Sequence, residues 1–181
     1  MMTAIDCSYE IILDEMQIRH RVRGLGRRIT EDYKGKDLFV VGILKGSFVF
    51  LSDLIRSIDL PMNIDFISVS SYGCEMESSG VVRLLYDLAN PIKGRDVLLV
   101  EDIVDTGLTM KYLVDNLSTR DPRTIKVCSF LDKKEARSCE VDLKIDYMGF
   151  EVPKKFLVGY GLDYNEKYRN LPFIAAIKGT E

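Results

Sequence analysis

Two stretches of the chain, residues 39–44 and 97–100, are apolar along their length, with no polar residue alternating within them. An unbroken apolar run suits a strand that is covered on both faces, as in a parallel sheet between two layers of helices. We therefore predict two buried parallel strands at these positions. Residues 63–70 and 125–130 predict two further strands.

Three other segments repeat their apolar residues every three or four positions, as an amphipathic helix does. The first of them begins after Asp14, whose spacing to Gln17 fits a capping box. The apolar faces of the three predicted helices are Ile18, Val22, Leu25 and Ile29, then Leu51, Leu54, Ile55 and Ile58, and finally Met110, Leu113, Val114 and Leu117.

Strands and helices therefore alternate along the first two thirds of the chain, which predicts an α/β fold. Shorter strands are expected around Ile145, Phe156 and Phe173, giving a β-rich section near the end. A length of 181 residues, 46% of them apolar, suits one compact domain.

Composition excludes several classes of protein. A formal net charge of -3 argues against a nucleic-acid-binding surface over the whole protein. The cysteines Cys7, Cys74, Cys128 and Cys139 lack the spacing of disulfide frameworks or metal sites, and they predict reduced thiols in a cytoplasmic protein. His20 is the only histidine, which excludes histidine-dependent triads and multi-histidine metal sites.

Neither a secretion signal nor a membrane span is predicted. Acidic residues come before any long apolar run, and the most apolar stretch, residues 38–54, is interrupted by glycines and charges. The first helix carries a cluster of arginines, which we interpret as a solvated or subunit-contact face because acids follow at once and no aromatic residues interleave. The cluster consists of Arg19, Arg21, Arg23, Arg27 and Arg28.

The strand at residues 97–100 leads into the most informative segment. Glu101 and Asp102 follow it, Asp105 comes three residues later, and residues 106–109 (Thr-Gly-Leu-Thr) form a turn that opens a helix. Ligands of open α/β sheets bind at such strand ends. Backbone N–H groups at a helix N-terminus, beside threonine hydroxyls, suit a phosphate. Adjacent carboxylates suit a diol or a hard divalent cation, so the segment predicts a ribose 5-phosphate site.

Two simpler readings of the same acids remain open at this point. The acids could keep a strand end soluble before an ordinary capped helix, which is the better explanation for a lone acid pair. They could also bind magnesium for phosphoryl transfer, as in a response-regulator or phosphatase-like domain. Both readings leave Thr106, Gly107 and Thr109 without a purpose, and the second also leaves Lys45 and Gly46 unexplained.

Three more segments are candidates for binding. Lys45, Gly46 and Ser47 form a second strand-to-helix turn, where a lysine and open backbone N–H groups suit a diphosphate. Lys133 follows the strand at residues 125–130. The loop at residues 71–80, which begins with Ser71 and Tyr72, is polar and punctuated by glycines, and its length favours a lid.

Residues 101–109 resemble the phosphoribosyl-diphosphate-binding signature of the type I phosphoribosyltransferases. A second segment, residues 152–166 with the run Gly-Leu-Asp-Tyr-Asn-Glu, looks like the hypoxanthine–guanine branch of that family. The resemblance extends from the first helix to Arg169. It implies one domain over residues 1–181, with a mostly parallel sheet flanked by helices as the core (about 35–130) and a small hood from the N-terminal segment and about 131–181.

The resemblance also implies a role for each candidate residue. The ribose and its 5-phosphate would be held by Glu101, Asp102, Asp105, Thr106, Gly107, Leu108 and Thr109. The diphosphate would be bound by Lys45, Gly46 and Arg169. The purine would be bound by Lys133, Phe156, Leu157 and Asp163. Magnesium would be held by Glu101, Asp102 and Asp163.

Within these sets the resemblance makes Asp105 the general base and gives Lys133 the task of donating to the exocyclic oxygen of a 6-oxopurine. Phe156 would stack on the purine, and the backbone of Leu157 would read its edge. It also implies a cis peptide bond between Leu44 and Lys45. One departure is Leu108, where some members of the family have a lysine; backbone N–H groups bind the phosphate whatever the side chain.

The implied reaction transfers a 5-phosphoribosyl group from 5-phosphoribosyl 1-diphosphate to N9 of hypoxanthine or guanine, with Mg²⁺, and leaves the preference among hypoxanthine, guanine and xanthine open. The implied partners are these small molecules and further copies of the chain in a homodimer or homotetramer, with no nucleic acid and no membrane. The rival is a regulatory protein of the same fold that binds nucleic acid. It requires a broad basic face and does not require Lys133, Phe156 and Asp163 together.

Overall fold

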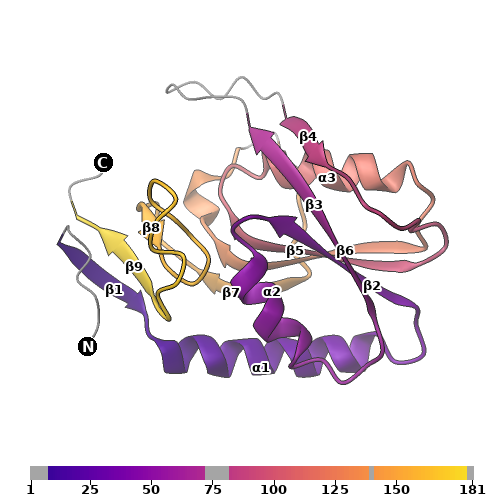
Figure 1. The fold of residues 1–181 in the computed structure, drawn as a ribbon, viewed down its shortest axis with the longest axis horizontal. Coiled ribbons are helices and arrows are strands. Elements are labelled where there is room, and N and C mark those ends of the chain that lie inside the picture. The colour runs from indigo at the N-terminus through magenta and orange to yellow at the C-terminus, as the bar shows by residue number, and fades with distance from the viewer. Residues whose placement is uncertain (1–7, 72–81, 139–140, 179–181) are drawn as a thin grey trace.

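The computed structural model describes residues 8–71, 82–138 and 141–178. It contains a six-stranded sheet with helices on both faces and a three-stranded sheet at one end of the molecule (Figure 1). The elements in chain order are β1 (Tyr9–Leu13), α1 (Glu15–Asp32), β2 (Leu38–Leu44), α2 (Phe48–Ile55), β3 (Asn63–Ser71), β4 (Val82–Tyr86), β5 (Asp96–Val104), α3 (Leu108–Ser118), β6 (Thr124–Asp132), a 3₁₀ turn (Lys134–Ala136), β7 (Tyr147–Glu151), β8 (Leu157–Val158) and β9 (Ile174–Ile177).

The larger sheet has the strand order β4-β3-β2-β5-β6-β7. Its strand pairs are parallel except for β3 with β4, which is antiparallel. The predicted α/β fold with a central, mostly parallel sheet is therefore confirmed. Because β2, β5 and β6 are adjacent and parallel, their carboxyl ends meet at the same edge of the sheet.

The apolar run of β5 is divided between two hydrophobic cores. Leu98 and Val100 pack in the core that includes residues of α1 and α2, whereas Val97 and Leu99 pack in the core that includes residues of α3. Successive side chains of a strand point to opposite faces, so a strand between two helical layers needs apolar residues at every position. In Figure 1, α2 crosses in front of the sheet and α3 lies behind it.

Helix α1 begins where the capping-box pattern predicts. The Asp14 carboxylate accepts a hydrogen bond from the Gln17 backbone N–H at 2.8 Å, and the Gln17 side chain accepts one from the Asp14 N–H at 2.9 Å. The predicted apolar face of this helix is buried. In the arginine cluster, Arg21 donates to the carbonyls of Met148 and Gly149 at 2.7 Å each, so it ties α1 to β7 and is not a purely solvated residue.

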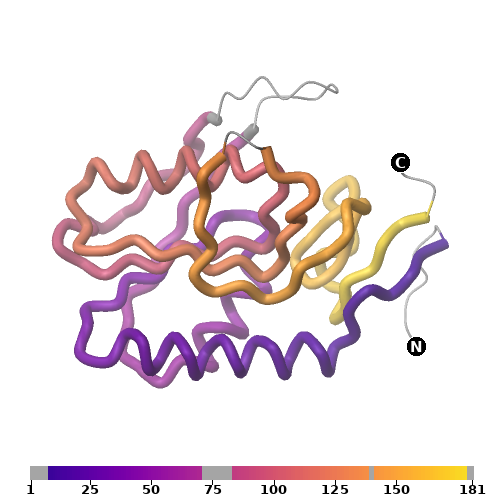
Figure 2. The backbone as a smooth tube through the Cα atoms, turned by 180° about the vertical axis from the view of Figure 1, so that it is seen from behind, coloured from indigo at the N-terminus to yellow at the C-terminus, as the bar shows by residue number. Residues whose placement is uncertain are grey.

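The smaller sheet has the order β1-β9-β8 and a hydrophobic cluster of its own. Figures 1 and 2 show it from opposite sides, next to the amino end of α1. The sequence analysis placed the boundary between the core and the hood near residue 130. The boundary between the two sheets lies elsewhere, because β7 pairs with β6 and extends the central sheet. The smaller sheet takes its strands from residues 9–13, 157–158 and 174–177.

Strand β5 is longer than the sequence predicts. It continues to Val104, which is buried and pairs with Asp132 of β6, so Glu101 and Asp102 lie inside the strand and not after it. Of the predicted lid, Ser71 is the last residue of β3, while Tyr72 and the residues up to 80 lie outside the described part of the chain. Among the described residues, no helix is long and apolar enough to cross a membrane.

Candidate active site

The turn from β5 into α3 forms a small concave site. It surrounds a cavity of about 130 Å³. Gly107 adopts a left-handed conformation (φ +83°) directly before Leu108, the first residue of α3. The Thr106 hydroxyl accepts a long hydrogen bond from the Leu108 N–H at 3.4 Å. A turn and a helix N-terminus that open onto a cavity are suited to an anion. The cavity is lined by Glu101, Ile103, Val104, Asp105, Thr106, Gly107, Thr109 and Met110.

The acid pair, of which Glu101 lines this cavity, is electrostatically unfavourable. Burial raises the pKa of Glu101 well above its usual value, and the neighbouring carboxylate of Asp102 raises that pKa further. Glu101 Oε2 is buried with no hydrogen-bond partner among the described residues, and Asp102 is also buried. A hydroxyl donor or a divalent cation would satisfy this oxygen and offset the charge repulsion.

The turn after β2 contacts the acid pair. The Leu44–Lys45 peptide bond is cis, as the resemblance implies. Gly46 lies so close to Asp102 that a Cβ at this position would overlap the carboxylate. Gly161 approaches the Gly46 carbonyl in the same way, so its missing side chain lets the loop after β8 rest on this turn. The candidate diphosphate turn is therefore packed between the acid pair and the loop after β8.

Asp105 and Lys133 form an ion pair at the strand ends. Lys133 Nζ lies 3.1 Å from Asp105 Oδ2, and its side chain is 14% exposed whereas that of Asp105 is 52% exposed. The Lys133 backbone N–H donates to the Val104 carbonyl at 2.9 Å, which fixes the end of β6 against the end of β5. The predicted proton acceptor and the predicted purine-oxygen donor are thus brought together.

The loop after β8 places a charged network beside Lys45. Arg169 forms an ion pair with Asp163 at 2.8 Å and donates to the Gly161 carbonyl at 2.8 Å. Glu166 contacts both Lys45 and Arg169. The sequence analysis gave Glu166 no role, because its contact with Lys45 joins positions 121 residues apart and depends on the conformation of the loop.

The remaining predicted residues lie in and beside the smaller sheet. Phe156 is 40% exposed, and Tyr164 packs edge-on against it with ring centroids 5.5 Å apart. Leu157 is buried in β8. Asp163 is engaged by Arg169 and by the Glu166 N–H at 2.9 Å. Among the described residues no three acidic, cysteine or histidine side chains form a possible metal site, so Glu101, Asp102 and Asp163 are not gathered into one.

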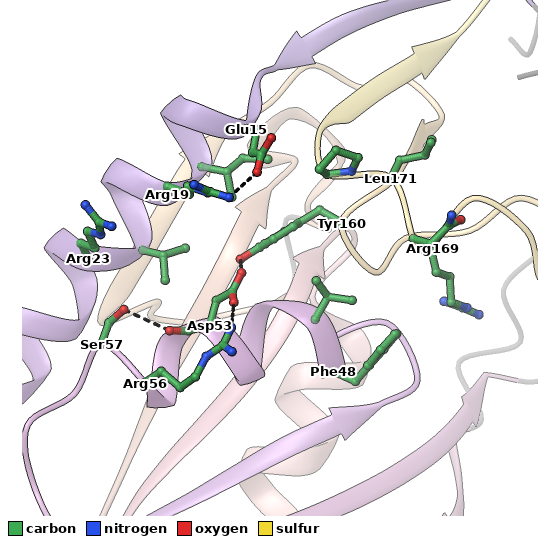
Figure 3. A pocket seen from close by; sticks show the side chains of 15 residues that line it. Glu15, Arg19, Arg23, Phe48, Asp53, Arg56, Ser57, Tyr160, Arg169 and Leu171 are labelled. Atoms are coloured by element: carbon green, nitrogen blue, oxygen red, sulfur yellow. Dashed lines mark hydrogen bonds and ion pairs between the residues drawn. The ribbon is translucent and has the colours of Figure 1, made fainter. Parts of the chain in front are cut away.

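A larger cavity of about 680 Å³ lies between α1, α2 and the loop at 169–172, and Arg169 is the one predicted site residue among those that line it. Its charged groups are largely paired with one another: Arg19 with Glu15, and Arg56 with Asp53, which also accepts a hydrogen bond from the Tyr160 hydroxyl. Figure 3 shows that the guanidinium of Arg169 lies on the side away from Arg19. This cavity holds none of the predicted catalytic residues.

Comparison with known proteins gives consistent similarities. Residues 8–165 match the family described as the phosphoribosyl transferase domain. The chain is 52% identical over 175 residues to a hypoxanthine-guanine phosphoribosyltransferase of Dictyostelium discoideum, covering 94% of this chain and 96% of that protein. It is 44% identical over 169 residues to the Bacillus subtilis protein of the same name, covering 93% of each. A hypoxanthine phosphoribosyltransferase structure from Staphylococcus aureus superposes with a TM-score of 0.90 at 44% identity, covering 96% of this chain and 92% of that one.

Proposed function

The chain belongs to the phosphoribosyltransferase family, and from this premise we propose that it transfers the 5-phosphoribosyl group of 5-phosphoribosyl 1-diphosphate to N9 of hypoxanthine or guanine. The products are the purine mononucleotide and diphosphate, so the protein is a pentosyltransferase of purine salvage. The observation that carries this conclusion is the ion pair of Asp105 with Lys133 at the edge of the phosphate-binding turn.

In this reaction the bond between the anomeric carbon and the diphosphate oxygen breaks and a bond from N9 to the same carbon forms. Diphosphate leaves with the electron pair of the broken bond. Asp105 accepts the proton from N7 of the purine, which makes N9 the nucleophile. Glu101 and Asp102 accept hydrogen bonds from the ribose hydroxyls, and the N–H groups of residues 106–109 bind the 5-phosphate. The half-exposed Asp105 carboxylate is free on one side to receive that proton.

Lys133 supplies the discrimination between purines. Its ammonium group has only donors, so it pairs with the exocyclic oxygen of a 6-oxopurine and opposes the amino group of adenine. Because the side chain is only 14% exposed, little water can separate the ammonium group from an adenine amino group, and such sites reject the wrong substrate strongly. Phe156 is exposed enough to stack on the base.

The acid pair suits a magnesium ion. Glu101 and Asp102 are adjacent carboxylates with one unsatisfied buried oxygen. Magnesium is usually held by one or two carboxylates together with substrate oxygens and water, and Glu101 and Asp102 would provide two. When bound, the ion would neutralise the departing diphosphate.

The nucleic-acid-binding alternative is not supported. The relatives named above are transferases. In the arginine cluster of α1, Arg21 is tied to the backbone of β7, Arg19 is paired with Glu15, and Arg28 stacks over the Tyr147 ring at 5.1 Å. Three of the five arginines of the cluster are therefore engaged by other groups of the chain.

We also propose that the chain acts in the cytoplasm as a homodimer or homotetramer. Cys128 is a buried, unpaired thiol, as expected of a reducing compartment. Met16 on α1 and Phe48 on α2 are 71% and 46% exposed, which suits a contact with another copy. Sedimentation velocity at micromolar concentration tests this; a protein that stays monomeric there contradicts it.

Replacing Asp105 with asparagine tests its role as the general base. The amide cannot accept the proton, so turnover should fall about 10²–10⁴-fold, the usual contribution of such a group. The affinity for 5-phosphoribosyl 1-diphosphate, measured by calorimetry, should stay close to that of the parent protein. Unchanged turnover in Asp105→Asn would remove Asp105 from this role.

A further inference from the structure

A single carboxylate oxygen contacts two cations from separate parts of the chain. Glu166 Oε2 lies 3.2 Å from Lys45 Nζ and 3.4 Å from Arg169 Nη2. Lys45 follows β2 in the central sheet, whereas Arg169 lies in the loop between β8 and β9. The Glu166 oxygen therefore accepts from an ammonium and from a guanidinium group. An oxygen of a bound diphosphate would occupy the same position and contact the same two groups.

The backbone turns Glu166 toward these cations. Asn165 and Glu166 both adopt left-handed conformations, with φ values of 52° and 62°. This conformation is uncommon for a residue other than glycine and persists where its surroundings maintain it. Here Asp163 accepts a hydrogen bond from the Glu166 N–H at 2.9 Å, and it forms an ion pair with Arg169 at 2.8 Å. The loop is thus folded around Asp163 so that the Glu166 carboxylate faces outward between Lys45 and Arg169.

A more highly charged anion could displace Glu166 from its contact with Lys45. The side chains of Lys45 and Glu166 are 68% and 67% exposed, and exposed ion pairs of this kind are weak. The hydrogen bond and charge of Lys45, and then the charge of Arg169, lower the pKa of Glu166, so it is ionised at neutral pH. Arg169 Nε is buried and has no hydrogen-bond partner among the described residues, which leaves Arg169 with a donor to spare.

We propose that Glu166 is an internal counter-anion of the diphosphate site, which holds Lys45 and Arg169 while the site is free and is displaced when diphosphate binds. The inference rests on the proposed function, since it takes Lys45 and Arg169 as diphosphate ligands. Lys45, Arg169, Asp163 and Glu166 together carry no net charge. Glu166 therefore weakens diphosphate binding and helps the product to leave, because it recaptures both cations.

The test is the binding of magnesium pyrophosphate, measured by calorimetry, to the parent protein and to Glu166→Gln. The substitution removes one negative charge beside an anion, so pyrophosphate should bind about fivefold more tightly, as expected for one charge a few ångströms away in a water-like dielectric. Glu166→Asp keeps the charge and should bind pyrophosphate close to the parent value. Binding of IMP, which has no diphosphate, should not change in either variant.

Glu31→Gln is the matched control. Glu31 is 68% exposed and pairs with Lys34 at 2.8 Å, much as Glu166 pairs with Lys45, but it lies near the carboxyl end of α1. It should leave pyrophosphate binding unchanged, which separates a local effect from a change in net charge. Equal affinity of Glu166→Gln and the parent protein for pyrophosphate would overturn the counter-anion role.

Lys45→Met distinguishes this inference from the proposed function. If Lys45→Met weakens pyrophosphate binding while Glu166→Gln has no effect, the diphosphate site stands and the counter-anion role alone is wrong. If Lys45→Met does not weaken pyrophosphate binding, diphosphate does not bind at Lys45. The assigned diphosphate site is then wrong, and the role of Glu166 is overturned with it.

Discussion

Glu101 is a residue whose environment opposes its own charge. Burial and the adjacent Asp102 carboxylate both raise its pKa, and one of its oxygens is buried without a partner. A group in this state costs stability whenever it is ionised. Such a cost is expected at a binding site, where the ligand supplies the missing hydrogen bond or charge. The acid pair therefore lowers the stability of the free protein and makes the binding of a ligand at this position more favourable.

Glu101→Gln should make this cost visible as a dependence of stability on pH. A raised pKa means that the folded protein prefers the protonated carboxyl, so the parent protein loses stability as the pH rises through the folded-state pKa. The uncharged variant lacks this loss. Urea denaturation should give Glu101→Gln a larger free energy of unfolding than the parent protein, by a margin that grows as the pH rises above the usual glutamate pKa of 4.5. The exposed Glu135→Gln is the control, and a margin independent of pH would contradict the prediction.

Contacts between individual side chains were the feature least predictable from the sequence. The resemblance implied roles for Asp105 and Lys133, but their direct ion pair depends on the parallel pairing of β5 with β6, which the sequence does not encode locally. Glu166 is a clearer case. Its contact with Lys45 requires two successive left-handed residues that are not glycine, and no local pattern predicts that conformation for Glu166.

At the scale of elements, the hydrophobic pattern predicted most of the central sheet. Continuous apolar runs identified β2 and β5, and the capping box located the start of α1. The end of β5 was predicted too early, because polar Glu101 and Asp102 interrupt its apolar run while backbone pairing with β6 continues to Val104. The place of β7 in the central sheet was also missed, since strand pairing is a non-local property.

The turn into α3 yields a prediction at this scale. Gly107→Ala places a Cβ on a residue with φ +83° and only 3.0 Å from Val141, so it should destabilise the protein by about 1–2 kcal/mol and distort the N–H groups that face the phosphate. The KM for 5-phosphoribosyl 1-diphosphate should rise at least tenfold, as the loss of about 1.4 kcal/mol of binding implies.

Gly94→Ala is the matched control for Gly107→Ala. Gly94 has φ +72° with open space around its Cα, and it lies before the amino end of β5. It should lose similar stability in urea denaturation without a change in the KM for 5-phosphoribosyl 1-diphosphate. A similar rise in this KM for both variants would mean that stability, and not the phosphate turn, is responsible.

At the scale of the whole molecule, the proposed site would draw its residues from both sheets. The central sheet provides Glu101, Asp102, the turn at residues 105–109 and Lys133. The segment around the smaller sheet provides Phe156 and the network of Arg169. The two parts meet where Gly161 rests on Gly46 and where Glu166 contacts Lys45. In the proposed site, these contacts would bring the groups for the sugar phosphate, the diphosphate and the base together, as a glycosyl transfer to a purine requires.

The most direct test compares kcat/KM of the purified protein for hypoxanthine and for adenine, with saturating 5-phosphoribosyl 1-diphosphate and magnesium, and nucleotides separated by chromatography. The donor-only ammonium of Lys133, on a side chain that is 14% exposed, should give hypoxanthine an advantage of about 10⁴-fold over adenine, since a site built to hydrogen-bond one polar group rejects an analogue that lacks it. IMP should form readily, and AMP should be barely detectable. Comparable rates of IMP and AMP formation, or no nucleotide at all, would contradict 6-oxopurine phosphoribosyl transfer by this protein.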